Sequence, residues 1–264
     1  MSMFGRNAAT AGSADSAIEG LLFAGRDLAF VAKRTLHFVT RKTRAGSAAQ
    51  YMYEMGNQSL FFLCVVMGFV GMILVYQGGL QLQRIFPEMS QLGGSYTELL
   101  IKDLAPTVCA LMLSTRVGAG IAAEIGSMVV TEQVDALRMC AADPIDYLIR
   151  PRFVASVVMT PILVIVAATV AYLTGMATAN AFFEVSTSTF TNLTLIDKGD
   201  IIVGLSKCLA YGAAIPLVSG YCGLTCYGGS EGVGQATTRA VVSSCLWVIV
   251  LDFVLSAAGF IIFE

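Results

Sequence analysis

The sequence contains few charged residues and a single histidine. Asp, Glu, Lys and Arg make up 13% of the 264 residues, and His37 is the only histidine. A typical soluble domain is about 25% charged, so a soluble fold is disfavoured. A Cys/His metal site lacks ligands. An intramembrane enzyme would need a nucleophile with a base, or paired carboxylates, and the chain shows neither at suitable spacing. The composition also gives no reason to expect a nucleic acid as a partner.

Long apolar runs take the place of the missing charge. Hydrophobic residues make up 56% of the chain, and its mean hydropathy is +0.74. A helix needs about 20 apolar residues to cross a bilayer, and five runs come close to this length: residues 59–80, 99–123, 153–183, 201–224 and 240–263. Pro106 and Arg116 interrupt the second run, and the third is long enough to tilt. The sequence predicts an all-α integral membrane protein with five transmembrane helices.

The first 58 residues contain no long apolar run, and we expect no cleaved signal peptide there. Residues 21–39 mix apolar and charged side chains and precede a basic cluster at residues 41–44. This pattern favours an amphipathic helix in the membrane interface, beside an anionic leaflet. An ordinary solvated helix also fits. We divide the chain into an N-terminal cytoplasmic region, residues 1–58, and a single transmembrane domain, residues 59–264.

Basic residues are distributed unequally between the two sides that five spans would define. With the N-terminus in the cytoplasm, the outer loops keep only Arg84 and Lys198, both near acidic residues. The inner side then carries Arg26, Lys33, Arg34, Arg41, Lys42, Arg44, Arg138, Arg150, Arg152 and Arg239. The positive-inside rule therefore predicts a cytoplasmic N-terminus, a C-terminus on the outer side and a cytoplasmic location for residues 124–152.

The seven cysteines are expected to be free. Four of them lie inside the apolar runs, and Cys140 lies in the segment that we place in the cytoplasm. Buried thiols in apolar surroundings, or thiols in a reducing compartment, are more typical than disulfides for such positions. Cys222 and Cys226 are spaced as helical neighbours.

Residues 124–152 form a charged segment between two apolar runs. Four apolar residues recur at helical spacing on one face: Val130, Val134, Leu137 and Ala141. Glu132, Asp135 and Met139 fall on another face, which predicts a short amphipathic helix along the membrane surface. Such a helix favours docking of a partner outside the membrane. A simple connecting loop is the alternative, although such loops are usually short and irregular.

Prolines mark the boundaries inside this segment. Asp143 precedes Pro144 and suits an N-cap position, with Pro144 as the first helical residue and Asp146 in the first turn. Arg150 and Pro151 repeat this pattern, which predicts that the third span begins there.

The chain has no site of its own for ATP. A P-loop needs the pattern GxxxxGK[ST], and no lysine occurs in that context. The glycine-rich stretch that begins at Gly228 lacks the lysine. We expect it to form a tight cytoplasmic turn before the fifth span, with Thr237 or Thr238 capping the last helix.

Ionisable residues inside the spans need a partner or water. Lys102 and Asp103 lie together at the outer end of the second span, and Lys207 lies in the outer half of the fourth. Two interpretations stay open for these three residues. They accommodate a polar headgroup near the outer exit, or they form salt bridges that only tie helices together.

Four further residues draw attention. Gln77 precedes two glycines at the outer end of the first span and either lines a cavity or belongs to a glycine-capped helix end. We expect Asp252 in the fifth span to have an interhelical structural role. Arg116 and Glu124 lie about two helical turns apart and share a face, so their partners must come from other helices.

These residues carry a resemblance to a known family. The segment between Arg116 and Arg152, with AAEIG, VTEQVDAL, DP and PR, resembles the MlaE/YrbE permeases, the membrane subunits of ABC lipid transporters that work with MCE proteins. The motifs GVGQATTRAVV at residues 232–242 and LDFVLS at residues 251–256 are similar too. The resemblance extends from about Tyr51 to the end of the chain.

The resemblance implies a homodimer in the inner membrane. Each copy is expected to have an interfacial N-terminal helix and five spans, and the pair to bind two cytoplasmic ABC ATPase subunits, a periplasmic MCE-domain hexamer and an accessory subunit on the ATPase. A phospholipid is expected in a cavity between the two permeases. ATP and Mg²⁺ would be bound by the ATPase, so this chain needs no cofactor.

The resemblance also assigns roles to residues. Residues 124–152 match the family's coupling helix, so six residues become candidates for ATPase coupling: Glu124, Thr131, Glu132, Asp135, Arg138 and Asp143. Lys102, Asp103, Lys207 and Gln77 match the lipid site. Lys102 replaces the more usual Arg and Asp103 the usual Glu, which keeps the charges but changes reach and geometry. Movement of residues 131–142 by the ATPase would then open or squeeze the lipid cavity.

Other functions are less well supported by the residues. A secondary transporter would place ionisable residues at the midplane between inverted repeats, and no such repeat is visible. A channel for a hydrophobic solute and a membrane anchor for partner subunits stay as alternatives. The lipid's identity and the direction of transport do not follow from apolar walls, which discriminate poorly among tails.

Overall fold

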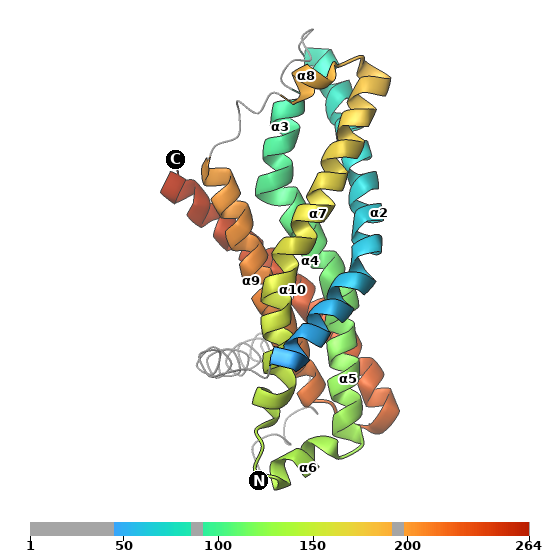
Figure 1. Cartoon of the computed structure of the whole chain (residues 1–264), viewed down its shortest axis with the longest axis vertical. Helices are drawn as coiled ribbons and strands as arrows, with labels where there is room; N and C mark the ends of the chain where they lie inside the picture. Colours follow the sequence, from blue (N-terminus) through green and yellow to red (C-terminus); the bar gives the residue numbers. More distant parts are fainter. Residues whose placement is uncertain (1–44, 86–91, 192–197, 264) are drawn as a thin grey trace, which may run out of the picture.

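The computed structural model describes residues 45–85, 92–191 and 198–263, and in these ranges it contains helices and no strand (Figure 1). Five helical stretches are long and apolar enough to cross a membrane: Ala48–Arg84, Leu92–Val130, Ile145–Phe183, Gly199–Leu224 and Gly229–Ile262. The predicted all-α fold with five spans is therefore confirmed. The predicted interfacial helix at residues 21–39 lies outside the described residues.

The first span is a single helix, α2 (Ala45–Ile85), which packs along α7 (Arg150–Phe183). Gly71 allows close approach, because a methyl group added there would lie 2.4 Å from the carbonyl oxygen of Ala171. Gly79 leaves room for the ring of Phe183 in the same way. The helix continues beyond Gly79 to Ile85, so the glycines next to Gln77 do not cap its end.

The second span is continuous but contains two wide turns. It runs through α3 (Leu92–Leu99), η2 (Leu100–Leu104), α4 (Ala105–Leu113), η3 (Ser114–Gly118) and α5 (Ala119–Val130), where η2 and η3 are π-helical. Pro106 has no backbone N–H to donate, and the π-helical turn directly before it absorbs this loss. Arg116 lies within the other wide turn. The two residues that interrupt the apolar pattern therefore widen the helix locally without ending it.

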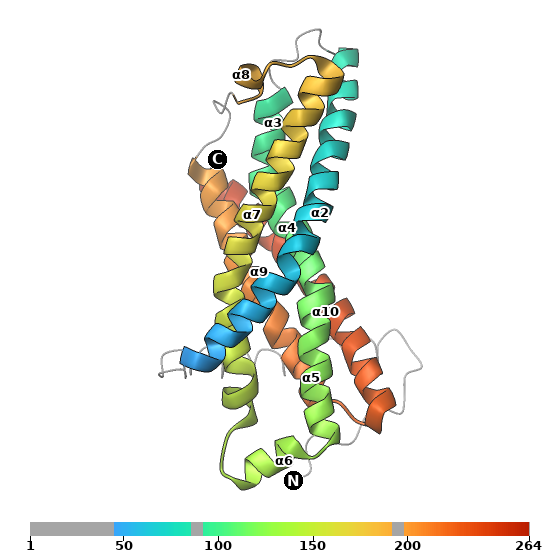
Figure 2. The same cartoon turned by 45° about the vertical axis from the view of Figure 1, so that its right-hand side comes forward.

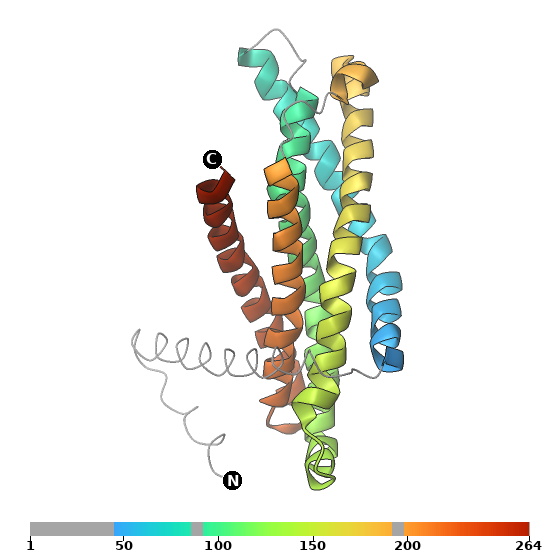
Figure 3. The same ribbon diagram turned by 60° about the vertical axis from the view of Figure 1, so that its left-hand side comes forward.

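The third and fourth spans end where the sequence predicts. Helix α7 ends at Phe183, and after the short α8 (Thr187–Phe190) helix α9 (Lys198–Leu224) ends at Leu224. In Figure 3, α9 lies between α7 and α10 along most of its length.

The fifth span, α10 (Gly229–Phe263), begins well before the predicted start at residue 240. The turn needs only Gly228 and Gly229, both with positive φ, and the helix then continues through the rest of the glycine-rich stretch. Thr237 and Thr238 donate their hydroxyl hydrogen bonds to the carbonyl of Gly234 inside the helix. An N-cap side chain accepts a hydrogen bond from the backbone, so the predicted capping role was wrong.

A helical hairpin projects beyond one end of the bundle (Figure 2). It consists of the end of α5, the short helix α6 (Gln133–Met139) and the π-helical turn η4 (Ile145–Ile149), which continues into α7. We call residues 124–152 the α6 hairpin. All seven cysteines are free, as predicted, and Cys140 in this hairpin is exposed.

The contact at Gly71 gives a first prediction. Gly71→Ala should lower the free energy of unfolding by about 1–3 kcal/mol, because the added methyl group forces α2 away from α7. Gly120→Ala is the matched control, because nothing lies within 4 Å of its added methyl group. Thermal unfolding of the purified chain in detergent measures both. Equal midpoints for the two variants would contradict the packing described.

Candidate functional site

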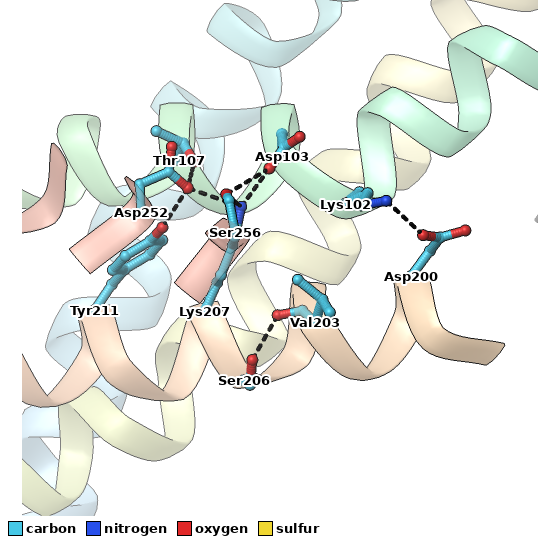
Figure 4. Close-up of polar contacts among 10 residues, drawn as sticks. All are labelled: Lys102, Asp103, Thr107, Asp200, Val203, Ser206, Lys207, Tyr211, Asp252 and Ser256. Atoms are coloured by element: carbon cyan, nitrogen blue, oxygen red, sulfur yellow. Dashed lines mark hydrogen bonds and ion pairs between the residues drawn. The ribbon is translucent and has the colours of Figure 1, made fainter. Parts of the chain in front are cut away.

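A fully buried lysine lies at the centre of a polar cluster inside the membrane domain. Lys207 of α9 contacts the carboxylate of Asp103 from η2, and its Nζ lies 2.9 Å from Oδ1 of Asp252 on α10. Nζ also donates to Oγ of Ser256, at 2.7 Å (Figure 4). One ammonium group therefore joins three helical segments that are far apart in the sequence.

Asp252 accepts two further hydrogen bonds. Its Oδ1 accepts hydrogen bonds from the hydroxyl groups of Thr107, at 3.0 Å, and Tyr211, at 2.7 Å. The expected interhelical partners of Asp252 are thus present. We call Asp103, Thr107, Lys207, Tyr211, Asp252 and Ser256 the Lys207 cluster.

The charges of the Lys207 cluster do not balance. One buried ammonium group faces two carboxylates, and the side chains of Asp103 and Asp252 are both partly exposed. A headgroup that approaches this cluster therefore meets carboxylate and hydroxyl oxygens, while the ammonium group of Lys207 lies behind them. This geometry fits the salt-bridge interpretation of Lys207, and contact with a headgroup stays a prediction.

Lys102 and Asp103 are neighbours in the sequence but have different partners. Nζ of Lys102 lies 3.2 Å from Oδ1 of Asp200 at the start of α9, while Asp103 turns toward Lys207 (Figure 4). The two residues are neighbours in η2, and successive residues of a helix point in different directions, which separates the two side chains. Sequence reasoning missed Thr107, Asp200, Tyr211 and Ser256. The available signal for the last two was their four-residue spacing from Lys207 and Asp252.

An apolar groove of about 440 Å³ lies beside this region, between η2, α4, α7 and α9. Its walls include Pro106, Pro161, Tyr172 and Leu205, and it is lined almost entirely by carbon. Gln77 is exposed on α2 and does not line this groove. In the described part of the chain, no group of three His, Cys, Asp or Glu residues is placed to bind a metal.

The α6 hairpin presents a polar surface away from the bundle. Val134 is buried and Leu137 packs partly against the same apolar cluster, as predicted. Thr131, Glu132, Asp135 and Arg138 are exposed, as is Met139, a residue that is 90% exposed. Asp135 and Arg138 form an ion pair of 2.8 Å within α6.

The predicted apolar face of α6 was too long. Val130 is exposed at the end of α5, and Ala141 is exposed beyond α6. Glu132 and Ala141 adopt left-handed backbone conformations, with φ of 61° and 57°, so the chain turns sharply before and after α6. Residues outside the helix no longer follow its 3.6-residue period, which explains the error.

The capping of the next helix is as the sequence predicts. Asp143 accepts a hydrogen bond from the backbone N–H of Ile145, at 3.2 Å, and Pro144 is the first helical residue. Helix α7 begins at Arg150 with Pro151 in its first turn, as predicted. The chain is already helical in η4, however, and no side chain caps the start of α7, so the capping pattern is not repeated there.

The two ends of the α6 hairpin meet at an ion pair. Oε1 of Glu124 on α5 lies 2.5 Å from Nη2 of Arg152 on α7. Nη1 of Arg152 donates to the carbonyl of Leu148, at 2.6 Å, and its guanidinium lies over the ring of Tyr51, 4.6 Å from the centroid. Glu124 thus finds its partner on another helix, as expected. Arg116 is exposed, and no ion pair joins it to another described residue.

These features define a class. A bundle of five helices long and apolar enough to cross a membrane, which holds a charge cluster and an apolar groove and projects a helical hairpin from one end, is a multi-pass α-helical membrane protein. It carries no strand in its described part.

Comparison with known proteins gives the family. Residues 48–258 match the family described as Permease MlaE, so the chain belongs to the MlaE permease family and is a membrane permease subunit. It is 34% identical to a probable ABC transporter permease protein of Synechocystis, over 84% of each chain. It is also 35% identical to the "intermembrane phospholipid transport system permease protein MlaE" of Haemophilus influenzae, over 79% of this chain and 81% of the relative. A probable ABC transporter permease protein of Rickettsia typhi is 37% identical, over 76% and 78%.

The Lys207 cluster gives a second prediction. Lys207→Met should lower the free energy of unfolding by about 3–5 kcal/mol, because it leaves two carboxylates without their cation. Arg138→Met removes the cation of an ion pair whose two side chains are both exposed and should cost only about 0–1 kcal/mol. Thermal unfolding in detergent compares the two. A Lys207→Met variant as stable as the wild type would contradict the role of the cluster.

Proposed function

We propose that this chain is the permease subunit of an ABC transporter that moves phospholipids between the inner membrane and an MCE-protein conduit. The observation that carries this proposal is the combination of an MlaE permease domain with the α6 hairpin. One relative is named an intermembrane phospholipid transport system permease protein. The proposal extends that relative's substrate to this chain.

The assembly that we propose is a homodimer with two ABC ATPase subunits in the cytoplasm. An MCE-domain hexamer would bind on the periplasmic side, and an accessory subunit would bind the ATPase. The N-terminus would then be cytoplasmic and the C-terminus periplasmic. In this orientation the α6 hairpin faces the ATPase, and the Lys207 cluster lies in the periplasmic half of the membrane.

Force enters through α6 in this proposal. Closure of the ATPases on ATP moves α6, and the spans attached to it change the width of a lipid cavity between the two copies. No bond in the lipid is made or broken, so the chain supplies positions and surfaces for transport. ATP and Mg²⁺ are bound by the ATPase.

The exposed residues of α6 are the best candidates for contact with the ATPase. Four residues project from the hairpin: Glu132, Asp135, Arg138 and Met139. Thr131 lies in the turn between α5 and α6. Asp143 and Glu124 have bonds inside the chain, at the cap of η4 and to Arg152. We therefore assign docking to the first group and maintenance of the hairpin's shape to Asp143 and Glu124.

The lipid site that we propose lies around Lys102 and the Lys207 cluster. The side chain of Lys102 is partly exposed, whereas that of Lys207 is buried, so Lys102 is the cation that a lipid phosphate reaches first. The carboxylates of Asp103 and Asp252 suit a cationic or hydrogen-bonding part of a headgroup. Gln77, on the neighbouring helix α2, remains a candidate for lipid contact.

Reconstitution tests the proposed function directly. The chain is copurified with its ATPase and placed in vesicles that contain a fluorescent phospholipid and a periplasmic acceptor. We expect transfer of the labelled lipid that depends on ATP, and phospholipid in the purified complex by mass spectrometry. Failure to copurify an ATPase, or hydrolysis without lipid transfer, would contradict the proposal.

The docking surface gives a further prediction. Asp135→Lys should weaken binding of the ATPase about tenfold, equivalent to ~1.4 kcal/mol, because it reverses a charge on the exposed face of α6. Insertion into the membrane should be unchanged. Glu184→Lys, an exposed charge reversal at the other end of α7, is the matched control. Equal ATPase affinity for both variants would exclude this face as the docking surface.

A further inference from the structure

The base of the α6 hairpin is closed by side chains from three helices. Glu124 comes from α5, Arg152 from α7 and Tyr51 from α2. Glu124 is the residue from which α5 leads into the hairpin, and Arg152 is the residue at which the chain returns. The hairpin is therefore joined at its base as well as through the backbone.

Arginine suits this position better than lysine. The side chain of Arg152 is only 2% exposed, so its charge needs partners on every side, and Glu124 supplies the opposite charge while remaining 46% exposed itself. The guanidinium uses one nitrogen for Glu124, another for the carbonyl of Leu148, and its flat face for Tyr51. A compact ammonium group cannot make the three contacts together.

The hairpin above this base is compact. Ile125 of α5, Val134 of α6 and Leu148 of η4 belong to one buried apolar cluster. At the end of α6, the N–H of Ala141 donates to the carbonyl of Arg138, and the N–H of Ala142 donates to the carbonyl of Leu137. These two hydrogen bonds fix the direction in which the chain leaves the helix. Movement of α6 is therefore carried to both α5 and η4, because the apolar cluster links all three elements.

We propose that Glu124, Arg152 and Tyr51 form a clamp that makes α2, α5 and α7 move as one unit when α6 is displaced. This inference rests on the proposed function, since it assigns the route by which force from the ATPase reaches the spans. The three side chains are positioning residues: they touch neither lipid nor nucleotide. Without the clamp, α6 would tilt alone, and ATP would be hydrolysed with little lipid moved.

The experiment uses the full chain copurified with its ATPase in vesicles and measures the amount of phospholipid transferred per ATP hydrolysed. Arg152→Gln removes the cation, and Tyr51→Leu removes the ring. Tyr51→Phe keeps the ring and should restore wild-type behaviour. Arg84→Gln, an exposed arginine at the far end of α2, is the matched control.

We expect Arg152→Gln and Tyr51→Leu to lower lipid transfer per ATP about fivefold or more, the lower limit of typical coupling between sites. Tyr51→Phe and Arg84→Gln should match the wild type. A complex with Arg152→Gln that assembles and transfers as much lipid per ATP as the wild type would overturn the clamp. If Arg152→Gln does not fold, Tyr51→Leu against Tyr51→Phe decides in the same way.

A second readout separates this inference from the proposed function. Hydrogen exchange at residues 124–152 of the chain alone should become faster in Arg152→Gln and stay unchanged in Arg84→Gln. If the wild-type complex moves no lipid, the proposed function fails, and the exchange data still judge the clamp. Unchanged exchange in Arg152→Gln would show that no clamp exists.

Discussion

The arrangement of the membrane domain depends on the ion pairs that the buried ammonium group of Lys207 forms. A charge without a partner at membrane depth costs several kcal/mol, so Asp103 and Asp252 must stay within reach of Lys207. Because these residues come from η2, α9 and α10, the three segments cannot separate far in that half of the molecule. The apolar groove beside η2 and α9 is positioned by the same constraint.

Wide helical turns place these charges and link them to the hairpin. The π-helical turn η2 carries Asp103, η3 lies between the Lys207 cluster and α5, and η4 leads from the hairpin into α7. Such turns weaken the regular hydrogen bonding of a helix and often occur at functional sites. The second span thus contains two positions where its direction can change, between a fixed polar cluster and the segment that we propose receives force.

Much of the fold follows from the sequence, because the length of each apolar run determines where a membrane span can lie. The ends at Phe183 and Leu224 and the cap at Asp143 were predictable, since local signals determine them. The start of α10 was not, because two glycines suffice for the turn and the remaining glycines are tolerated in a helix that packs against its neighbours. Which helix faces meet decides that Asp200 pairs with Lys102, that Arg152 pairs with Glu124, and that the ring of Tyr51 lies against Arg152. A single sequence does not contain that information.

A structure of the assembled transporter in a lipid bilayer, with nucleotide bound, tests the central claim most directly. The claim is that force received by α6 changes a lipid site in the opposite half of the membrane. We predict that α6 of each copy is buried against an ATPase subunit and that a phospholipid lies beside Lys102 and the Lys207 cluster. A complex in which α6 faces solvent, or in which the lipid lies away from these charges, would contradict the account.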